Sequence, residues 1–302
     1  MGDIRTIGFI GLGNMGVPMA ANLVRGGYQV IGFDLDAGRT QIFAKDHSAR
    51  ATSDLAELGK AADAIITMLP TGHDVRDVLL HAQGGALAAH LRAGAYVIDM
   101  SSADPVGTRA LGRDLAARSI TLIDAPVSGG VVRAKDGSLA IMIGGNASGV
   151  AAVKPLLTNM GQKLFEVGGL GCGHAMKALN NFLAATSFAA AAEAVAVGRR
   201  FGLDPAVMID VINVSTGRSF ASENLIKQHV LSGAFGTGFA LGLLAKDVGI
   251  AADLAEQIDM NAPLTQLIRD MWADAREAVG GDQDHTSAAP YWERRATRQA
   301  AE

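Results

Sequence analysis

The chain lacks several features that would mark a special class of protein. It has one cysteine, Cys172, in 302 residues, which excludes an internal disulfide and a cysteine-rich metal site. Its 26 basic and 30 acidic residues give no strongly basic face for nucleic acid. The most apolar stretch, 182–198, is mostly alanine and contains Glu193, so it falls short of the ~18 strongly apolar residues of a membrane span. We therefore expect a globular protein that binds no metal, nucleic acid or membrane.

The N-terminal region reaches an apolar run within a few residues, which leaves no room for a signal peptide. The expected location is the cytoplasm, or an organelle matrix if a leader was removed. At this length the chain can form two domains.

Up to about residue 167, short apolar runs alternate with longer amphipathic segments. The runs predict strands at 6–10, 29–33, 64–69, 95–100, 121–124, 139–143 and 163–166. The segments between them predict helices at 15–25, 36–45, 53–58, 73–80 and 108–118. This alternation indicates a doubly wound, mostly parallel α/β sheet.

The pattern changes after Gly173, where periodicity predicts one long helix over 174–200. Asp204 and Pro205 suit the N-cap and first turn of the next helix. Further helices are expected at 223–231, 240–258, 263–279 and 286–299, where Pro290 must start, kink or shorten the last one. We expect a dinucleotide-binding domain at 1–167 and an all-helical domain at 168–302, linked by the helix 174–200.

A glycine-rich segment lies between the first predicted strand and helix and reads Gly11-Leu12-Gly13-Asn14-Met15-Gly16. Gly11 can take a tight turn, Gly13 allows backbone to approach a pyrophosphate, and Gly16 lets the helix pack close to the strand. The flanking elements favour a dinucleotide-binding Rossmann domain over the alternative of a structural turn.

Asp34 ends the second predicted strand, at about the distance from the glycines where a carboxylate binds the ribose hydroxyls. A carboxylate there repels a 2′-phosphate, which favours NAD. Arg39 keeps NADP open, because a nearby arginine can accommodate that phosphate. The alternative for Asp34 is a turn residue at a strand end.

Three other groups could carry chemistry. Ser128, Gly129 and Gly130 form a loop that can present N–H groups to an anion, or a plain turn. Lys177 and Asn181 share one face of the long helix, with Asn180 beside them, and a lysine can serve as a proton donor. A solvated lysine is the alternative reading. Lys246-Asp247 could reach a cleft or mark a solvated helix face.

Together these motifs resemble the β-hydroxyacid dehydrogenase family, which includes 3-hydroxyisobutyrate dehydrogenase and tartronate semialdehyde reductase. The resemblance covers nearly the whole chain, with four motifs in the family's order. The matching segments are Phe9–Gly16 with Pro18-Met19-Ala20 and Asn22-Leu23, Asp124–Gly130 with Ala134, Gly171–Asn181, and Lys246-Asp247.

The resemblance implies hydride transfer between the nicotinamide and the 3-hydroxyl of a small hydroxy acid. It implies that Lys177 is the general acid/base, that Asn181 holds the substrate oxygen beside Asn180, and that Ser128, Gly129 and Gly130 bind the substrate carboxylate. The cofactor-binding residues it implies are Gly11, Leu12, Gly13, Asn14, Met15, Gly16, Asp34, Leu69, Pro70, Ser102 and Lys246. Homodimers or homotetramers through the helical domain are also implied.

Two other functions stay open. Imine reductase-like relatives generally lack the lysine, so Lys177 argues against that activity. A non-catalytic dinucleotide-binding module would have lost the Lys177/Asn181 pair. His174 could touch cofactor or substrate, and Arg218 could pair with a second carboxylate or be structural. The remaining histidines, His285 among them, are expected at the surface.

Overall fold

The computed structural model describes residues 4–81 and 86–299. By its internal contacts the chain divides into two units, Met1–Lys177 and Ala178–Glu302. We call them the Rossmann unit and the helical unit. The division falls within helix α8 (Cys172–Phe201), which begins in the first unit and continues in the second. The predicted end of the dinucleotide-binding fold, residue 167, lies one residue before the end of its last strand, β9, at Gly168.

The Rossmann unit is built on one sheet, ordered β3-β2-β1-β4-β5-β6-β8-β7, with β9 beside β8. Its strands are β1 (Thr6–Ile10), β2 (Gln29–Phe33), β3 (Arg50–Ala51), β4 (Ala64–Thr67), β5 (Tyr96–Asp99), β6 (Thr121–Asp124), β7 (Val127–Ser128), β8 (Leu139–Gly144) and β9 (Gly161–Gly168). The pairs from β3 through to β6 are parallel, whereas β8 runs antiparallel to β6 and β7. The doubly wound, mostly parallel sheet is thus confirmed.

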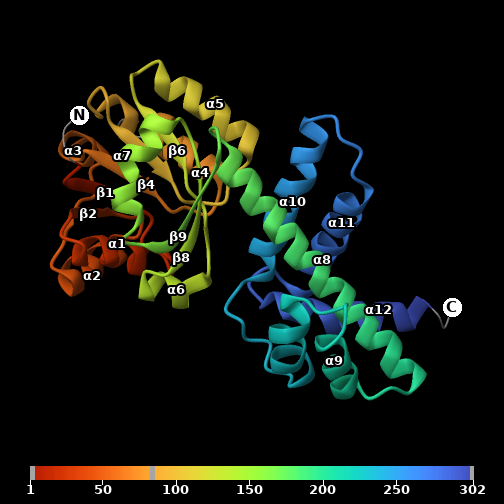
Figure 1. Ribbon diagram of the computed structural model, residues 1–302. Helices are drawn as coiled ribbons and strands as arrows, with labels where there is room; N and C mark the ends of the chain where they lie inside the picture. Colours follow the sequence, from red (N-terminus) through yellow and green to blue (C-terminus); the bar gives the residue numbers. More distant parts are fainter. Residues whose placement is uncertain (1–3, 82–85, 300–302) are drawn as a thin grey trace. The chain divides into compact units, whose positions relative to one another are not determined.

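Helices lie on both sides of this sheet (Figure 1). They are α1 (Gly16–Arg25), α2 (Ala37–His47), α3 (Leu55–Ala61), α4 (Gly72–Arg76), the π-helix η1 (Asp77–His81), the 3-10 helix η2 (Leu87–Ala89), α5 (Pro105–Ala116), α6 (Gly130–Asp136) and α7 (Ala147–Leu157). Successive residues of a strand point to opposite faces of the sheet, so they belong to two separate cores. Ile98 belongs to the core that includes residues of α1, α2, α6 and α7, whereas its neighbour Val97 belongs to the core that includes residues of α3, η1, η2 and α5.

Several sequence-based boundaries in this unit were wrong. The strands β3 and β7 and the helices α6 and α7 were not predicted, and α5 begins at Pro105 because Asp104 caps it. The strand β4 ends at Thr67 rather than at residue 69. Its continuation leaves the ladder because the N–H of Leu69 donates to Ser101 Oγ at 2.9 Å.

The helical unit continues α8 and adds α9 (Pro205–Asn213), the π-helix η3 (Ser222–Leu231), α10 (Leu241–Gln257), α11 (Pro263–Val279), the 3-10 helix η4 (His285–Ser287) and α12 (Ala288–Gln299). Asp204 caps α9 through the N–H groups of Ala206 and Val207, as predicted. In the part of this unit that the structure describes, no strand forms, although Ala240 and Asp284 make an isolated bridge.

By length and composition alone, α8 could cross a membrane. Its residues Phe188, Ala192 and Val195 are instead buried in the core of the helical unit, together with Trp272. One such helix is weak evidence for a membrane span.

His285 contradicts the expectation that it lies at the surface. It is 6% exposed and packs against Phe188, Phe239 and Trp272. Its Nδ1 lies 3.2 Å from the carbonyl oxygen of Phe239. Burial lowers the pKa of His285 below its ordinary value, although neighbouring Asp284 opposes the shift. The surface prediction failed because isolated histidines carry no periodic signal of burial.

Candidate active site

The glycine loop has the geometry that each of its glycines was expected to need. Gly11 has a φ of +97°, and a Cβ there would collide with the carbonyl oxygen of Met68. A Cβ on Gly16 would collide with the carbonyl oxygen of Gly11. A Cβ on Gly13 meets no atom within 4 Å, so that position opens onto free space. Two glycines therefore serve chain packing, and the third leaves an open cradle that fits a pyrophosphate.

Asp34 ties the end of β2 to this loop. Its carboxylate accepts hydrogen bonds from the N–H of Leu12 at 2.7 Å and of Asp36 at 2.9 Å. Arg39 Nη1 lies 3.9 Å from the same carboxylate. The structure thus places Asp34, which was expected to favour NAD, beside Arg39, which was expected to keep NADP open.

The remaining cofactor positions of this unit follow parallel strands and meet at one edge of the sheet. Leu69 and Pro70 follow β4, and Ser102 follows β5, whose register pairs Thr67 with Asp99. Ser101 was not predicted, yet its hydroxyl binds the N–H of Leu69 and joins the two loops. In doubly wound folds the ligand crevice lies outside the carboxyl ends of the strands, so these residues fit a dinucleotide.

The Ser128 loop lies between β7 and α6. Gly129 and Gly130 have φ values of 135° and 65°, and both are exposed. Because L-residues rarely adopt such φ values, the two glycines are needed for the backbone path. Ser128 is half-buried and pairs with Ala140 across the ladder to β8.

The start of α8 is held by a carboxylate that sequence reasoning did not single out as functional. Asp124, at the end of β6, is fully buried and accepts hydrogen bonds from the N–H groups of Gly171 and His174, both at 2.8 Å. It thereby acts as a helix cap supplied by another element. His174 is 1% exposed, and Lys177 lies one turn later and is half-buried.

In the helical unit, a buried hydrogen bond joins α8 to α10. Asn181 Nδ2 donates to Asp247 Oδ2 at 2.6 Å, and both side chains are buried. Lys246 Nζ lies 3.3 Å from Asp247 Oδ1, and Asn180 Nδ2 donates to Asn181 Oδ1 at 3.2 Å. The structure therefore joins three predicted residues through Asp247. The available signal was an aspartate set among the apolar residues of a predicted helix.

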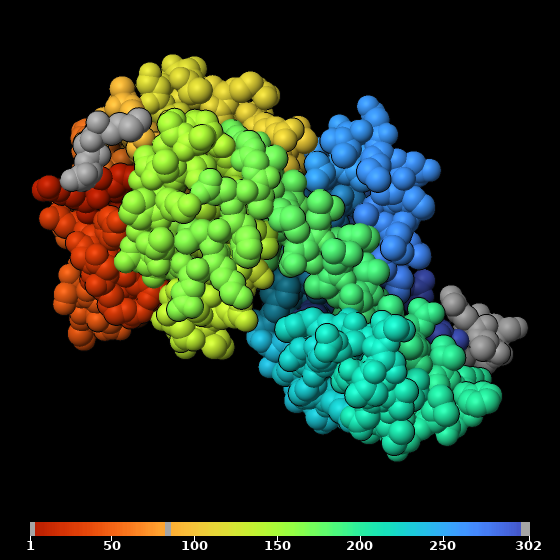
Figure 2. All heavy atoms as spheres, in the orientation of Figure 1, coloured from red at the N-terminus to blue at the C-terminus, as the bar shows by residue number. Residues whose placement is uncertain are grey.

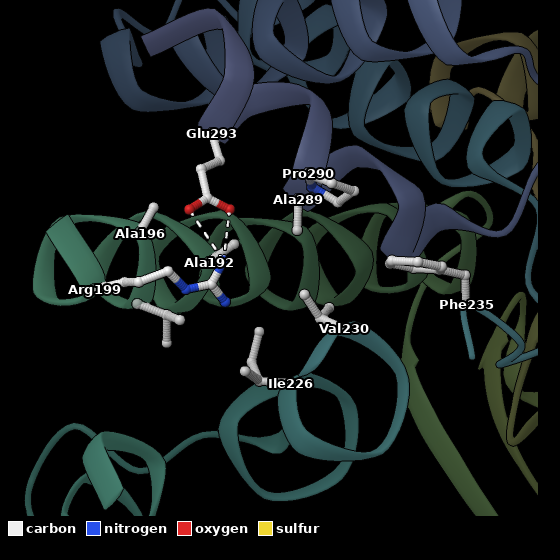
Figure 3. A pocket seen from close by; sticks show the side chains of 10 residues that line it. Ala192, Ala196, Arg199, Ile226, Val230, Phe235, Ala289, Pro290 and Glu293 are labelled. Carbon is white, nitrogen blue, oxygen red and sulfur yellow. Dashed lines mark hydrogen bonds and ion pairs between the residues drawn. The ribbon is translucent and has the colours of Figure 1, made fainter. Parts of the chain in front are cut away.

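Other positions take no part in these clusters. Arg218 is exposed and lies 3.6 Å from Glu223 Oε1. Figure 3 shows a small pocket in the helical unit, spanned by Arg199 and Glu293 whose side chains are 3.2 Å apart. None of the predicted site residues lines that pocket. Within residues 4–81 and 86–299, no group of three His, Cys, Asp or Glu residues could hold a metal ion.

Comparisons with known proteins agree with this geometry. Residues 6–169 match the NAD binding domain of 6-phosphogluconate dehydrogenase, and residues 171–292 match the NAD-binding domain of NADP-dependent 3-hydroxyisobutyrate dehydrogenase. The chain is 36% identical over 288 residues to 2-(hydroxymethyl)glutarate dehydrogenase of Eubacterium barkeri, covering 95% of this chain and 94% of the relative. It is 36% identical to 3-hydroxyisobutyrate dehydrogenase of Pseudomonas aeruginosa, covering 88% and 91%.

A solved structure of Mycobacterium tuberculosis 3-hydroxyisobutyrate dehydrogenase with L-serine superposes with a TM-score of 0.86 at 32% identity. It covers 96% of this chain and 99% of that one. Both halves of the chain match the same kind of enzyme, and the glycine cradle fits the cofactor that such enzymes use. The chain belongs to the β-hydroxyacid dehydrogenase family of NAD(P)-dependent oxidoreductases.

Proposed function

We propose that this protein is an NAD-preferring dehydrogenase that oxidises the 3-hydroxyl of a small hydroxy carboxylate, in a reversible reaction. The observation that carries the proposal is the pairing on α8. Lys177 and Asn181 stand one turn apart on one helix face, and Asp247 fixes the amide of Asn181. The relatives named for hydroxymethylglutarate and hydroxyisobutyrate support a substrate in which one carbon separates the carboxylate carbon from the carbon that bears the hydroxyl.

Each residue then has one task. Lys177 takes the proton of the substrate hydroxyl during oxidation and returns it to the carbonyl oxygen during reduction. Asn181 keeps one amide hydrogen for the substrate oxygen, because its other one is bound by Asp247. The N–H groups at Ser128, Gly129 and Gly130 hold the carboxylate. When bound, the nicotinamide accepts or supplies the hydride.

The cofactor preference depends on Asp34. Its carboxylate is 10% exposed and stands at the ribose-binding position of the fold, where it repels a 2′-phosphate. We expect Asp34→Ala to raise the ratio of kcat/KM for NADP to that for NAD at least tenfold, because the repulsion is lost while Arg39 remains. A wild-type enzyme that already prefers NADP would refute the NAD preference.

A substrate panel tests the proposed reaction. The panel holds 3-hydroxyisobutyrate, serine, glycerate, threonate and 3-hydroxypropionate, each assayed for NADH and NADPH production. At least one acid should be turned over by the wild-type enzyme, and by Lys177→Ala at least about 100-fold more slowly. Turnover at the wild-type rate after this substitution would remove the lysine from the mechanism and favour another reaction on the same fold.

The proposal includes a cytoplasmic homodimer or homotetramer formed through the helical unit. Large apolar side chains are exposed from the end of α8 through α9, and Figure 2 shows this turquoise segment on the surface of the unit. Phe201 is 85% exposed and Val214 is 87% exposed. Large exposed apolar side chains gathered in one segment are typical of association sites. Light scattering coupled to gel filtration gives the oligomeric state.

A further inference from the structure

Three buried polar side chains lie next to one another at the carboxyl ends of β4, β5 and β6. The sheet register pairs Thr67 with Asp99 and Asp99 with Asp124. All three are at most 2% exposed. They belong to the same alternating set as Val97 and Leu122, which face α5. Two carboxylates therefore sit side by side in the core of the Rossmann unit, where unpaired charge is costly.

Asp99 supports both strand-end loops that carry predicted cofactor contacts. Its Oδ1 accepts hydrogen bonds from Thr67 Oγ1 at 2.9 Å and from the N–H of Ser101 at 3.0 Å. The hydroxyl of Ser101 in turn binds the N–H of Leu69. Asp99 Oδ2 faces His174 Nε2 at 3.7 Å. Among the described residues, that nitrogen has no hydrogen-bond partner although it is buried.

The other ring nitrogen of His174 is held by α5. Thr108 Oγ1 lies 2.8 Å from His174 Nδ1 and 2.9 Å from the carbonyl oxygen of Asp104. When the hydroxyl donates its one hydrogen to Nδ1, the hydrogen of the neutral ring is on Nε2, which can then donate toward Asp99 Oδ2. The contact with Thr108 orients the ring so that its Nε2 edge faces Asp99.

We propose that His174 is a positioning residue that links the turn of α8 bearing Lys177 to Asp99, the carboxylate that supports the Leu69 and Ser101 loops. The inference rests on the proposed function, because it assigns His174 to the same reaction. The general acid/base and the cofactor loops are thus set by one buried network. His174 touches neither cofactor nor substrate, because its side chain is 0% exposed.

Two conservative substitutions of His174 distinguish the contact of Nδ1 with Thr108 from the contact of Nε2 with Asp99. An asparagine amide reaches the place of Nδ1 and can keep the bond to Thr108, whereas a glutamine amide reaches the place of Nε2 and can bind Asp99. We expect His174→Ala to lower kcat about 10- to 100-fold with little change in the KM for the hydroxy acid, since small misplacements cost that much. His174→Gln should recover kcat to within about threefold of wild type, and His174→Asn should not.

A second readout does not depend on activity. In hydrogen–deuterium exchange, His174→Ala and Asp99→Asn should both speed exchange in residues 67–71 and 99–104. Asp63→Ala is the matched control. Asp63 accepts bonds from the N–H groups of Arg5 and Thr6 at the opposite edge of the sheet, so its loss should speed exchange only there.

The outcomes are distinguishable. A folded His174→Ala enzyme with wild-type kcat and unchanged exchange at 67–71 and 99–104 overturns the inference and leaves the proposed function standing. Rescue by asparagine in place of glutamine overturns the link to Asp99. A wild-type enzyme inactive on every acid of the panel refutes the proposed function instead, and the exchange data still decide the link.

Discussion

The two units present their functional groups in different ways. In the Rossmann unit the proposed cofactor positions are mainly backbone, namely glycines and N–H groups where parallel strands end. In the helical unit the proposed site residues are side chains that bind one another, as Asn181 and Asp247 do across 66 positions of sequence. Backbone sites need particular φ values or free space and therefore leave glycines in the sequence. Side-chain sites depend on which helices become neighbours.

The largest effect expected from this contrast is at Lys177, the last residue of the Rossmann unit. Lys177→Ala should lower kcat by a factor of about 10² to 10⁴, the usual contribution of a general acid/base. Binding of NAD should not change, because the glycine loop and Asp34 are intact. Steady-state kinetics and calorimetric titration with NAD measure the two quantities. Lys154→Ala, which removes only an exposed ion pair with Glu166, is the control.

Two glycine substitutions test which glycines of the cofactor loop serve packing and which leaves space for the cofactor. Gly13→Ala should raise the Kd for NAD at least tenfold without changing the melting temperature, because its methyl group enters the open cradle. Gly11→Ala should lower the melting temperature, because an alanine at φ +97° costs roughly 1–2 kcal/mol and meets Met68. If both variants melt like wild type, the distinction between packing and cradle glycines is wrong.

The side-chain interactions of the helical unit are tested at Asp247. Asp247→Asn keeps the shape but removes the charge that orients Asn181, so kcat should fall roughly 10-fold. The KM for NAD reports any additional effect through Lys246, whose Nζ lies 3.3 Å from Asp247. Asp253→Asn on the same helix breaks an exposed ion pair with Arg269 and should leave kcat unchanged. Equal losses in the two variants would contradict the assignment.

The smallest effect concerns stability, and it should be confined to the helical unit. Because burial lowers the pKa of His285, the unfolded chain takes up a proton below pH 6.5 that the folded unit resists. Stability should therefore be full above pH 6.5 and fall as the pH drops, by up to about 1.4 kcal/mol per pH unit.

Both tryptophans, Trp272 and Trp292, belong to this unit, so urea unfolding followed by their fluorescence measures it selectively. His285→Phe should flatten the profile between pH 6.5 and 5. The carboxylate of Asp284 affects stability only at lower pH. Burial alone would raise its pKa, but hydrogen bonds from Thr286 and Thr237 outweigh that effect and hold it at about 2. A wild-type profile that is flat from pH 7.5 to 5 contradicts the assignment to His285.

Particular residues show how far the sequence predicts such a site. Gly11, Gly13 and Gly16 were predictable together with their separate tasks, because spacing and flanking elements define a strand–turn–helix. Asp247 could be named as part of a motif, but its bond to Asn181 required knowing that α8 and α10 pack side by side. Ser101 and Asp99 were not found, since nothing local distinguishes them from other polar residues at strand ends.

The sequence by itself determined the α/β and helical halves, the dinucleotide loop and the position of Lys177 relative to Asn181. These depend on local periodicity and on helix spacing, which short segments contain. Only the tertiary structure decided that β8 runs antiparallel, that Asp124 caps α8, and that His174 and His285 are buried. Those features depend on which strands and helices become neighbours, and the energy that selects neighbours comes from burial of the whole core rather than from any one segment.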